Sequence, residues 1–298
     1  MTSVTSPNKN DTPPPKKFSH FANITSGFFA SIVMSSIFQP LDLIKIKMQQ
    51  TAEKQKFLQV LKSIYKNGGI FAFYRGTMLA FIAGGCVASS RMYTYKFFEH
   101  KSTEPGPLSK TSTRILVSSA VIGIFTALIQ TPVEHIRIRM NCPVYGNDYS
   151  GSIDALIKMR RIYGIKNVMK GYSLTVMREF WYYIFFFNIY ENTKNIFTVL
   201  GYKNLGISMG GMTSGPISWF MTYPLDTLKT QMQTDHLASP VWTVRKYLQH
   251  LARTRLLLTL YNGLGTVLMR SVLTNLLYFN VWENSLSFFE QLESKYLE

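Results

Sequence analysis

Hydrophobic residues dominate three long stretches of the chain that contain no formally charged side chain. These stretches cover residues 18–41, 115–133 and 204–225. An α-helix rises about 1.5 Å per residue, so about 20 apolar residues are enough to cross a bilayer. Uncharged runs of this length favour membrane-spanning helices over a soluble helical protein with amphipathic helices.

Three further apolar stretches alternate with the uncharged ones, and each is interrupted by charge near its middle. The stretches are 76–98, 172–197 and 264–289, and the interrupting residues are Arg91, the pair Arg178 and Glu179, and Arg270. A charged side chain at the centre of a bilayer costs about 3 kcal/mol, so such a group is expected to face protein or water. We therefore predict six spanning helices.

A short motif recurs three times along the chain. It consists of a proline, an acid two positions later and a base three positions after the acid. The copies are Pro40, Asp42 and Lys45; Pro132, Glu134 and Arg137; and Pro224, Asp226 and Lys229. The prolines are 92 residues apart in both intervals. This constant spacing predicts a threefold repeat, and each proline is expected to bend its helix.

The repeat divides the chain into a proline-rich, disordered tail at 1–17 and three repeats at 18–107, 108–201 and 202–298. Each repeat also has a shorter stretch with apolar residues at helical spacing, which predicts an amphipathic surface helix between two spans. Those residues are Phe57, Val60, Leu61 and Ile64; Ile153, Leu156 and Ile157; and Val244, Leu248 and Leu251. The predicted fold class is an all-α membrane protein of six spanning helices in three repeats of about 92 residues.

A second landmark follows each proline motif, a bulky residue, a base and a glycine. The copies are Tyr74-Arg75-Gly76, Met169-Lys170-Gly171 and Tyr261-Asn262-Gly263, the last of which lacks the base. With these residues the chain from position 18 onwards resembles the mitochondrial carrier family. The resemblance implies a pseudo-threefold bundle of six helices around a cavity, with three short helices on the matrix side. It also implies a solute carrier of the mitochondrial inner membrane that works by alternating access, with both termini toward the intermembrane space.

The resemblance implies that the motif charges pair between repeats and form a matrix gate. The implied pairs are Asp42 with Arg137, Glu134 with Lys229, and Asp226 with Lys45, and the implied bracing amides are Gln49, Asn141 and Gln233. The residues alone leave an alternative open. An acid and a base three positions apart also lie on one helix face, where a local pair contributes only a few tenths of a kcal/mol.

Glycines that follow a base mark candidate lipid sites at Arg75-Gly76 and Lys170-Gly171. A helix that begins at such a glycine offers free N–H groups and the positive end of its dipole to a phosphate. The resemblance implies that the phosphate belongs to cardiolipin. Asn262 replaces the base in the third repeat, which puts a third site in doubt.

The charges inside the spans are candidate substrate contacts. By resemblance, Arg91, Arg178, Glu179 and Arg270 face the cavity. The pair Arg178 and Glu179 resembles that of amino-acid and carnitine-type carriers, and a zwitterion needs one anchor of each sign. The predicted solute is therefore an amino-acid or carnitine-like zwitterion or a small anion. The alternative is an ion pair that only neutralises two intramembrane charges.

Small residues four positions apart occur in each uncharged span. The pairs are Gly27 with Ser31, Ser119 with Gly123, and Gly211 with Gly215. Such pairs allow helices to approach closely in lipid. We predict a packing seam at each of them.

A second gate, on the cytoplasmic side, is implied by resemblance at Lys194 and Glu283, but its pattern is incomplete. Lys96 and Glu99 carry the reversed signs in the first repeat, and bulky aromatic residues fill 180–187. These departures support an alternative function, a carrier-like protein that no longer transports and serves as a structural subunit of a respiratory-chain or ATP-synthase complex.

Charge and composition exclude several other classes. The chain has 32 Lys and Arg against 16 Asp and Glu, so an anionic partner is expected. The basic residues lie mainly at expected helix ends and in loops, which favours a membrane surface over nucleic acid as the anionic partner. Cys86 and Cys142 predict neither a disulfide framework nor a zinc site. The five histidines lack ligand spacing, and no phosphate-binding loop or nucleophile elbow occurs, so no metal, cofactor or enzymatic activity is predicted.

Overall fold

The computed structural model describes residues 20–50, 55–87, 108–235, 244–253 and 257–297, and all regular structure in these ranges is helical. The long helices are α1 (His20–Gln50), α4 (Leu108–Met140), α6 (Tyr172–Val199), α7 (Lys203–Thr234) and α9 (Leu264–Leu297). The short helices are α2 (Phe57–Gly68), α5 (Ser152–Val168) and α8 (Val244–Arg253), with single turns at Ile70–Tyr74, Gly146–Asp148 and Leu257–Tyr261. Another helix is described from Met78 to Val87. The predicted all-α fold is confirmed.

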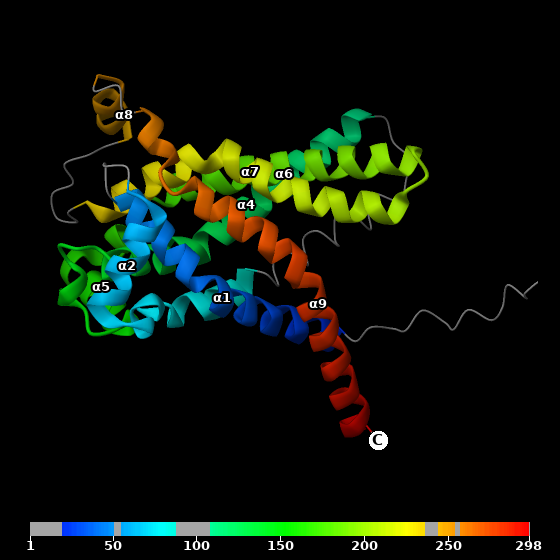
Figure 1. Ribbon diagram of the computed structural model, residues 1–298, viewed down its shortest axis with the longest axis horizontal. Coiled ribbons are helices and arrows are strands. Elements are labelled where there is room, and N and C mark those ends of the chain that lie inside the picture. The colour runs from blue at the N-terminus through cyan, green and yellow to red at the C-terminus, as the bar shows by residue number, and fades with distance from the viewer. Residues whose placement is uncertain (1–19, 51–54, 88–107, 236–243, 254–256, 298) are drawn as a thin grey trace, which may run out of the picture.

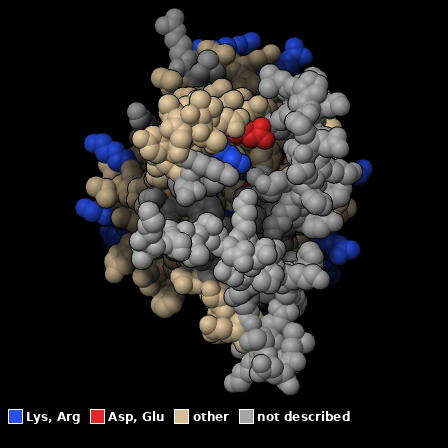
Figure 2. Space-filling model, turned by 90° about the vertical axis from the view of Figure 1, so that its right-hand side faces the viewer, with Lys and Arg blue, Asp and Glu red and all other residues tan. Residues whose placement is uncertain are grey.

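The long helices form a bundle, and the short helices lie at one end of it (Figure 1). Within the bundle, α6 packs along α7 and α4, and α1 packs along α9. Viewed from the end opposite the short helices, basic side chains mark the rim of the molecule, and acidic and basic atoms meet near the middle of the face (Figure 2). The two ends of the bundle therefore differ, because the short helices lie at only one of them.

The three motif prolines lie inside long helices. Pro40 is within α1, Pro132 within α4 and Pro224 within α7. Each helix continues past its proline, although proline removes one N–H from the hydrogen-bond ladder. Because the helices continue, the charged motif residues lie in their last turns, at the end of the bundle where α2 and α5 pack.

Two helices in the described ranges are long and apolar enough to cross a membrane, judged by length and composition. They cover Thr25–Gln50 and Leu116–Met140. Each of these helices contains most of one of the uncharged stretches found in the sequence. The full count of six spans depends on the threefold repeat and is proposed below.

The short helices pack against the ends of the long helices. On α2 the buried residues are Val60 and Ile64, which belong to the predicted face and contact Leu43 and Ile44 of α1. This packing holds α2 against the last turns of α1, next to the motif charges.

The packing of α5 agrees with the prediction only in part. Its buried apolar residues are Ala155, Met159 and Val168, which cluster with Ile136 of α4. The predicted residue Leu156 packs partly buried against the same cluster, whereas Ile153 and Ile157 are more than half exposed. Apolar residues occur on both sides of α5, so the sequence pattern alone does not select the face that contacts the protein.

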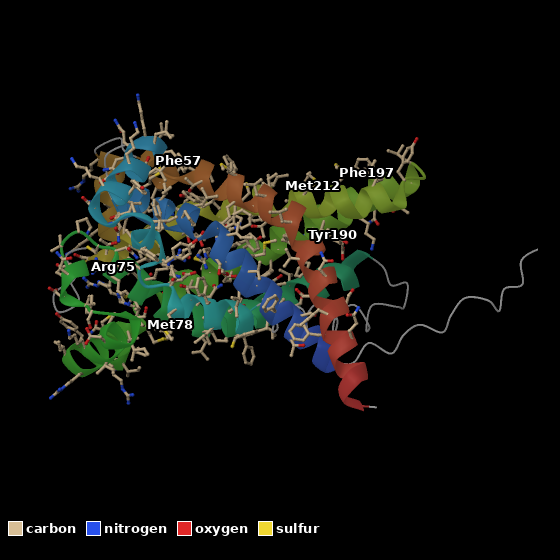
Figure 3. The ribbon with its side chains drawn as sticks, turned by 60° about the horizontal axis from the view of Figure 1, so that its bottom comes forward. Phe57, Arg75, Met78, Tyr190, Phe197 and Met212 are labelled. Carbon is tan, nitrogen blue, oxygen red and sulfur yellow. The ribbon has the colours of Figure 1, made fainter. Side chains whose placement is uncertain are left out.

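Two glycines bring α7 very close to α6. A Cβ atom at Gly206 would lie 2.8 Å from the Cβ atom of Phe197 and 3.0 Å from the carbonyl oxygen of Lys194. A Cβ atom at Gly210 would lie 3.0 Å from the ring of Tyr190 and 3.1 Å from its carbonyl oxygen. Tyr190 and Phe197 lie at the end of the bundle away from the short helices (Figure 3).

The predicted seams are correct only in part. Gly123 is such a position, because a Cβ atom there would lie 3.3 Å from the backbone nitrogen of Phe180. At Gly27 and Gly211, by contrast, a Cβ atom would meet no described heavy atom within 4 Å. The described residues therefore show no close approach at those two glycines, although a Cβ atom at Gly84 would lie 3.4 Å from the hydroxyl oxygen of Ser31, four positions after Gly27. The rotation of a helix about its axis decides which small residues face a neighbour.

Candidate gate and cavity residues

Three ion pairs join the last turns of α1, α4 and α7, and we call them the motif ion pairs. Lys45 Nζ lies 2.7 Å from Asp226 Oδ2, and Arg137 Nη1 lies 3.5 Å from Asp42 Oδ2. The third pair is Lys229 with Glu134. Every pair joins two different helices, so the three pairs link α1, α4 and α7 in a ring.

The environment of Asp226 is more protected than that of Asp42. Asp226 has a side-chain exposure of 4% and accepts hydrogen bonds from Gln49 Nε2 at 2.8 Å and from Arg178 Nη1 at 2.5 Å, besides its pair with Lys45. Desolvating a carboxylate is costly unless its lone pairs are satisfied, and here donors reach both oxygens.

Arg178 contacts two of the motif ion pairs from α6. Besides Asp226 of α7, its guanidinium lies 2.5 Å from Glu179 Oε1 and 3.7 Å from Glu134 Oε1. It also donates to Gln130 Oε1 of α4 at 3.2 Å. The side chain is only 4% exposed, so these groups of α4, α6 and α7 replace its hydration.

Arg270 contacts the remaining motif ion pair from α9. Its Nη1 lies 2.6 Å from Asp42 Oδ1, while 36% of its side chain stays exposed. Arg137 already binds Asp42 and donates to Gln39 Oε1 at 2.9 Å. Asp42 therefore faces two cations. Arg91, the fourth predicted cavity residue, lies outside the described residues.

The three predicted bracing amides do not act alike. Gln49 contacts a motif ion pair through Asp226. Asn141 instead donates to the carbonyl oxygens of Arg75 and Arg137, at 3.2 and 2.9 Å, and Gln233 donates to the carbonyl oxygen of Lys170 at 2.8 Å. These two amides fix the base-and-glycine steps against the ends of α4 and α7.

Glycine is required in these steps. Gly76, Gly171 and Gly263 have φ values of 79°, 85° and 83°, a left-handed conformation that other residues rarely adopt. Each also approaches the long helix of the next repeat, since a Cβ atom at Gly76, Gly171 or Gly263 would come within 3.3 Å of Met140, 3.2 Å of Gln233 or 3.3 Å of Met48, respectively. Gly263 also lies close to α7 of its own repeat, where a Cβ atom would come within 3.0 Å of Tyr223. The steps thus connect successive repeats.

The bases of the two predicted lipid sites differ in their surroundings. Arg75 donates to the carbonyl oxygen of Gly146 at 2.6 Å. Lys170 lies just before α6, and burial lowers its pKa, an effect opposed by Asp235 and increased by Arg139. A phosphate beside Lys170 would stabilise its charged form.

The sequence analysis did not predict a ring of hydrogen bonds from side chains to backbone carbonyl oxygens. Lys47 Nζ donates to the carbonyl oxygen of Asn141 at 2.5 Å, Arg139 Nη2 donates to that of Asp235 at 2.6 Å, and Gln231 donates to that of Gln49. The donors stand seven positions after the three prolines. The last carbonyl groups of a helix have no hydrogen-bond partner within that helix. Each of these donors supplies a hydrogen bond to one such carbonyl oxygen at the end of the next long helix. The repeat register was the signal that could have revealed these donors.

The predicted gate at the opposite end is described only in part. Lys194 Nζ lies 6.0 Å from the ring centroid of Tyr190. The side chain of Glu283 and residues Lys96 and Glu99 lie outside the described set, so the pairing of Lys194 with Glu283 stays a prediction.

Comparison with known proteins accounts for the threefold pattern. The family model described as mitochondrial carrier protein matches residues 16–105, 109–200 and 202–292. The glutamate/glycine mitochondrial carrier ymc1 of Schizosaccharomyces pombe is 28% identical over 87% of this chain and 91% of its own length. The mitochondrial carnitine/acylcarnitine carrier protein of Mus musculus is 27% identical over 92% and 96%, and the mitochondrial glycine transporter YMC1 of Saccharomyces cerevisiae is 27% identical over 72% and 73%. Three successive matches that cover nearly the whole chain show that it belongs to the mitochondrial carrier family.

Proposed function

We propose that this multi-pass transport protein of the mitochondrial inner membrane exchanges a small metabolite by alternating access, with the motif ion pairs as its matrix gate. One observation carries the proposal: all three pairs join different long helices, so α1, α4 and α7 cannot separate at this end without breaking them. A six-span bundle, two spans for each matched repeat, is part of the same proposal.

The proposed solute is an amino-acid or carnitine-like zwitterion or a small anion. Relatives named for glutamate, glycine and carnitine support this class. Arg270 also supports it, because a partly exposed guanidinium beside an acid that already has a second base can accept a solute carboxylate. Arg91 is proposed as a second cavity base. Arg178 and Glu179 are almost fully buried, and their part is argued in the next subsection.

Exchange in liposomes tests the proposed function. We expect the purified protein to exchange labelled carnitine, glycine or glutamate, and we expect Arg270→Gln to raise KM for the active solute about tenfold, since one charge-assisted contact is lost. Lys158→Gln, on the surface of α5 with 44% of its side chain exposed, is the matched control for removing a positive charge. Efficient exchange of ADP with none of these three solutes would contradict the proposed class.

Cardiolipin is proposed at Arg75-Gly76 and Lys170-Gly171, supported by the glycine geometry and by the burial of Lys170. The same liposomes, prepared with and without cardiolipin, test this part. We expect cardiolipin to speed exchange by the unmodified protein, and to speed exchange by Lys170→Gln to a smaller extent.

The proposed topology has both termini toward the intermembrane space and the proline motifs toward the matrix. It follows from two parts of the proposal above, the even number of spans and the matrix position of the gate. In mitoplasts, added protease is expected to remove tags from both termini, whereas intact mitochondria protect them. Two protected tags in mitoplasts would reverse the topology.

The non-transporting subunit is not favoured as an alternative, because the named relatives are carriers and transporters.

A further inference from the structure

We propose that Arg178 is a positioning residue of the matrix gate that holds α4, α6 and α7 together, and that the solute carboxylate binds Arg270 instead. This assignment deepens the proposed function and rests on it. It changes the expectation from the sequence, in which Arg178 and Glu179 form the solute contact.

The contacts of Arg178 connect three helices through one side chain. A guanidinium presents five N–H donors in a planar fork, so it can bind several acceptors at once. Here one side of the fork faces Asp226 of α7, and the other faces Glu179 of α6 and Gln130 of α4. Glu134 of α4 lies slightly farther away, at 3.7 Å. Arg178 therefore joins two motif ion pairs that would otherwise be separate.

The charges around Arg178 are balanced. Lys45, Lys229 and Arg178 supply three positive charges, and Asp226, Glu134 and Glu179 supply three negative charges. A solute carboxylate at Arg178 would have to displace Asp226 or Glu179 and leave that acid buried without its partner. Such a loss is strongly unfavourable for a carboxylate with 4% or 8% exposure.

Among the described residues, the charges paired at Arg270 are not balanced. Arg137 and Arg270 share the carboxylate of Asp42, which leaves one excess positive charge in this group of three. Arg270 is also the more accessible of the two arginines, at 36% against 4% exposure of the side chain. A solute carboxylate can therefore bind Arg270 and restore neutrality without breaking a buried ion pair.

The two arginines thus make the ring of motif ion pairs unequal. The pair of Glu134 with Lys229 is reinforced by Arg178, whereas the pair of Asp42 with Arg137 has the longest separation of the three, 3.5 Å. A solute bound to Arg270 competes with Asp42 for that guanidinium. We infer that the gate opens first between α1 and α4 and last between α4 and α7.

Cys142 offers a built-in reporter of this opening. It lies two residues past the end of α4 and is buried, next to the contact of Lys47 of α1 with Asn141. Cys86 is exposed and is replaced by serine, so that a maleimide reports Cys142 alone. The rate of labelling in proteoliposomes, without solute and with carnitine, glycine or glutamate added separately, then measures opening independently of transport.

The variants are predicted to separate the two roles. In Arg178→Gln/Glu179→Gln, which removes one charge of each sign, labelling without solute is expected to be about tenfold faster, because charge-assisted bonds that hold the closed state are lost. KM for the active solute should change little. In Arg270→Gln, labelling without solute should stay near that of the Cys86→Ser parent, while acceleration by solute is lost. Arg178→Lys, which has one compact cation in place of the fork, should give an intermediate rate.

Two results would overturn the assignment. One is unchanged labelling without solute in both Arg178 variants, each verified as folded by its thermal unfolding midpoint in detergent. The other is an increase in KM in the double variant equal to that in Arg270→Gln, which would make Arg178 a solute contact. If no tested solute accelerates labelling of the parent, the proposed solute class fails, while the comparison without solute still decides the part of Arg178.

Discussion

Replacing Asp226 with asparagine is expected to destabilise the protein far more than replacing Asp42 with asparagine. Asp226→Asn removes the charge that faces Lys45 and Arg178, both of which are largely buried. Leaving buried charges without their partner costs about 3–5 kcal/mol. Asp42→Asn should cost less, about 1–2 kcal/mol, because it strands one buried cation, Arg137, which keeps its hydrogen bond to Gln39, while its other partner Arg270 is partly exposed and can be hydrated.

Thermal unfolding of the purified variants in detergent measures this difference, and exchange in liposomes should be undetectable for Asp226→Asn. The double variant Asp226→Asn/Arg178→Gln removes one of the stranded cations and should recover part of the lost stability. Equal unfolding midpoints for Asp226→Asn and Asp42→Asn would show that the two acids are in equivalent environments, contrary to the contacts described above.

Adjacent glycines of α7 are expected to respond very differently to the same substitution. In Gly210→Val the added atoms would meet the backbone of Tyr190, which cannot move aside without separating α6 from α7. Overpacking of this kind costs about 1–3 kcal/mol. In Gly211→Val the Cβ atom meets no described heavy atom within 4 Å, so the stability should be close to that of the unmodified protein.

Because both substitutions place valine in the same helix, their intrinsic helix propensities cancel in the comparison. The measurement is again the unfolding midpoint in detergent, together with the amount of protein that can be extracted from the membrane. A larger loss for Gly211→Val than for Gly210→Val would mean that the seam follows the small residues predicted from the sequence.

Repetition made much of the proposed gate predictable. Pro40, Pro132 and Pro224 fix a common register, so residues at equal distance from them occupy equivalent places. The motif charges could be identified for this reason. The donors Lys47, Arg139 and Gln231 were missed although they share that register, because three different side chains do not look like one motif. Their common property is an N–H group within reach of a carbonyl oxygen.

Properties that depend on long-range contacts could not be predicted. The sequence shows Arg178 in an apolar span, but its partner Asp226 is 48 residues away. Only the packing of α6 on α7 brings them together. The buried face of α5 and the seam glycines Gly206 and Gly210 have the same origin, since helix rotation is set by neighbouring helices and not by local pattern.

Because of the ring of donors seven positions after the prolines, closure of the proposed gate depends on how far each long helix extends. Its acceptors are backbone carbonyl groups at Gln49, Asn141 and Asp235, at or just past the last residues of α1, α4 and α7. A substitution of the acceptor side chain leaves the carbonyl group in place. Fraying of the last helical turn, however, withdraws it. In the proposed gate, local melting at the three C-termini is thus coupled to closure, so the ends of these helices are expected to be thermally sensitive parts of the transport cycle.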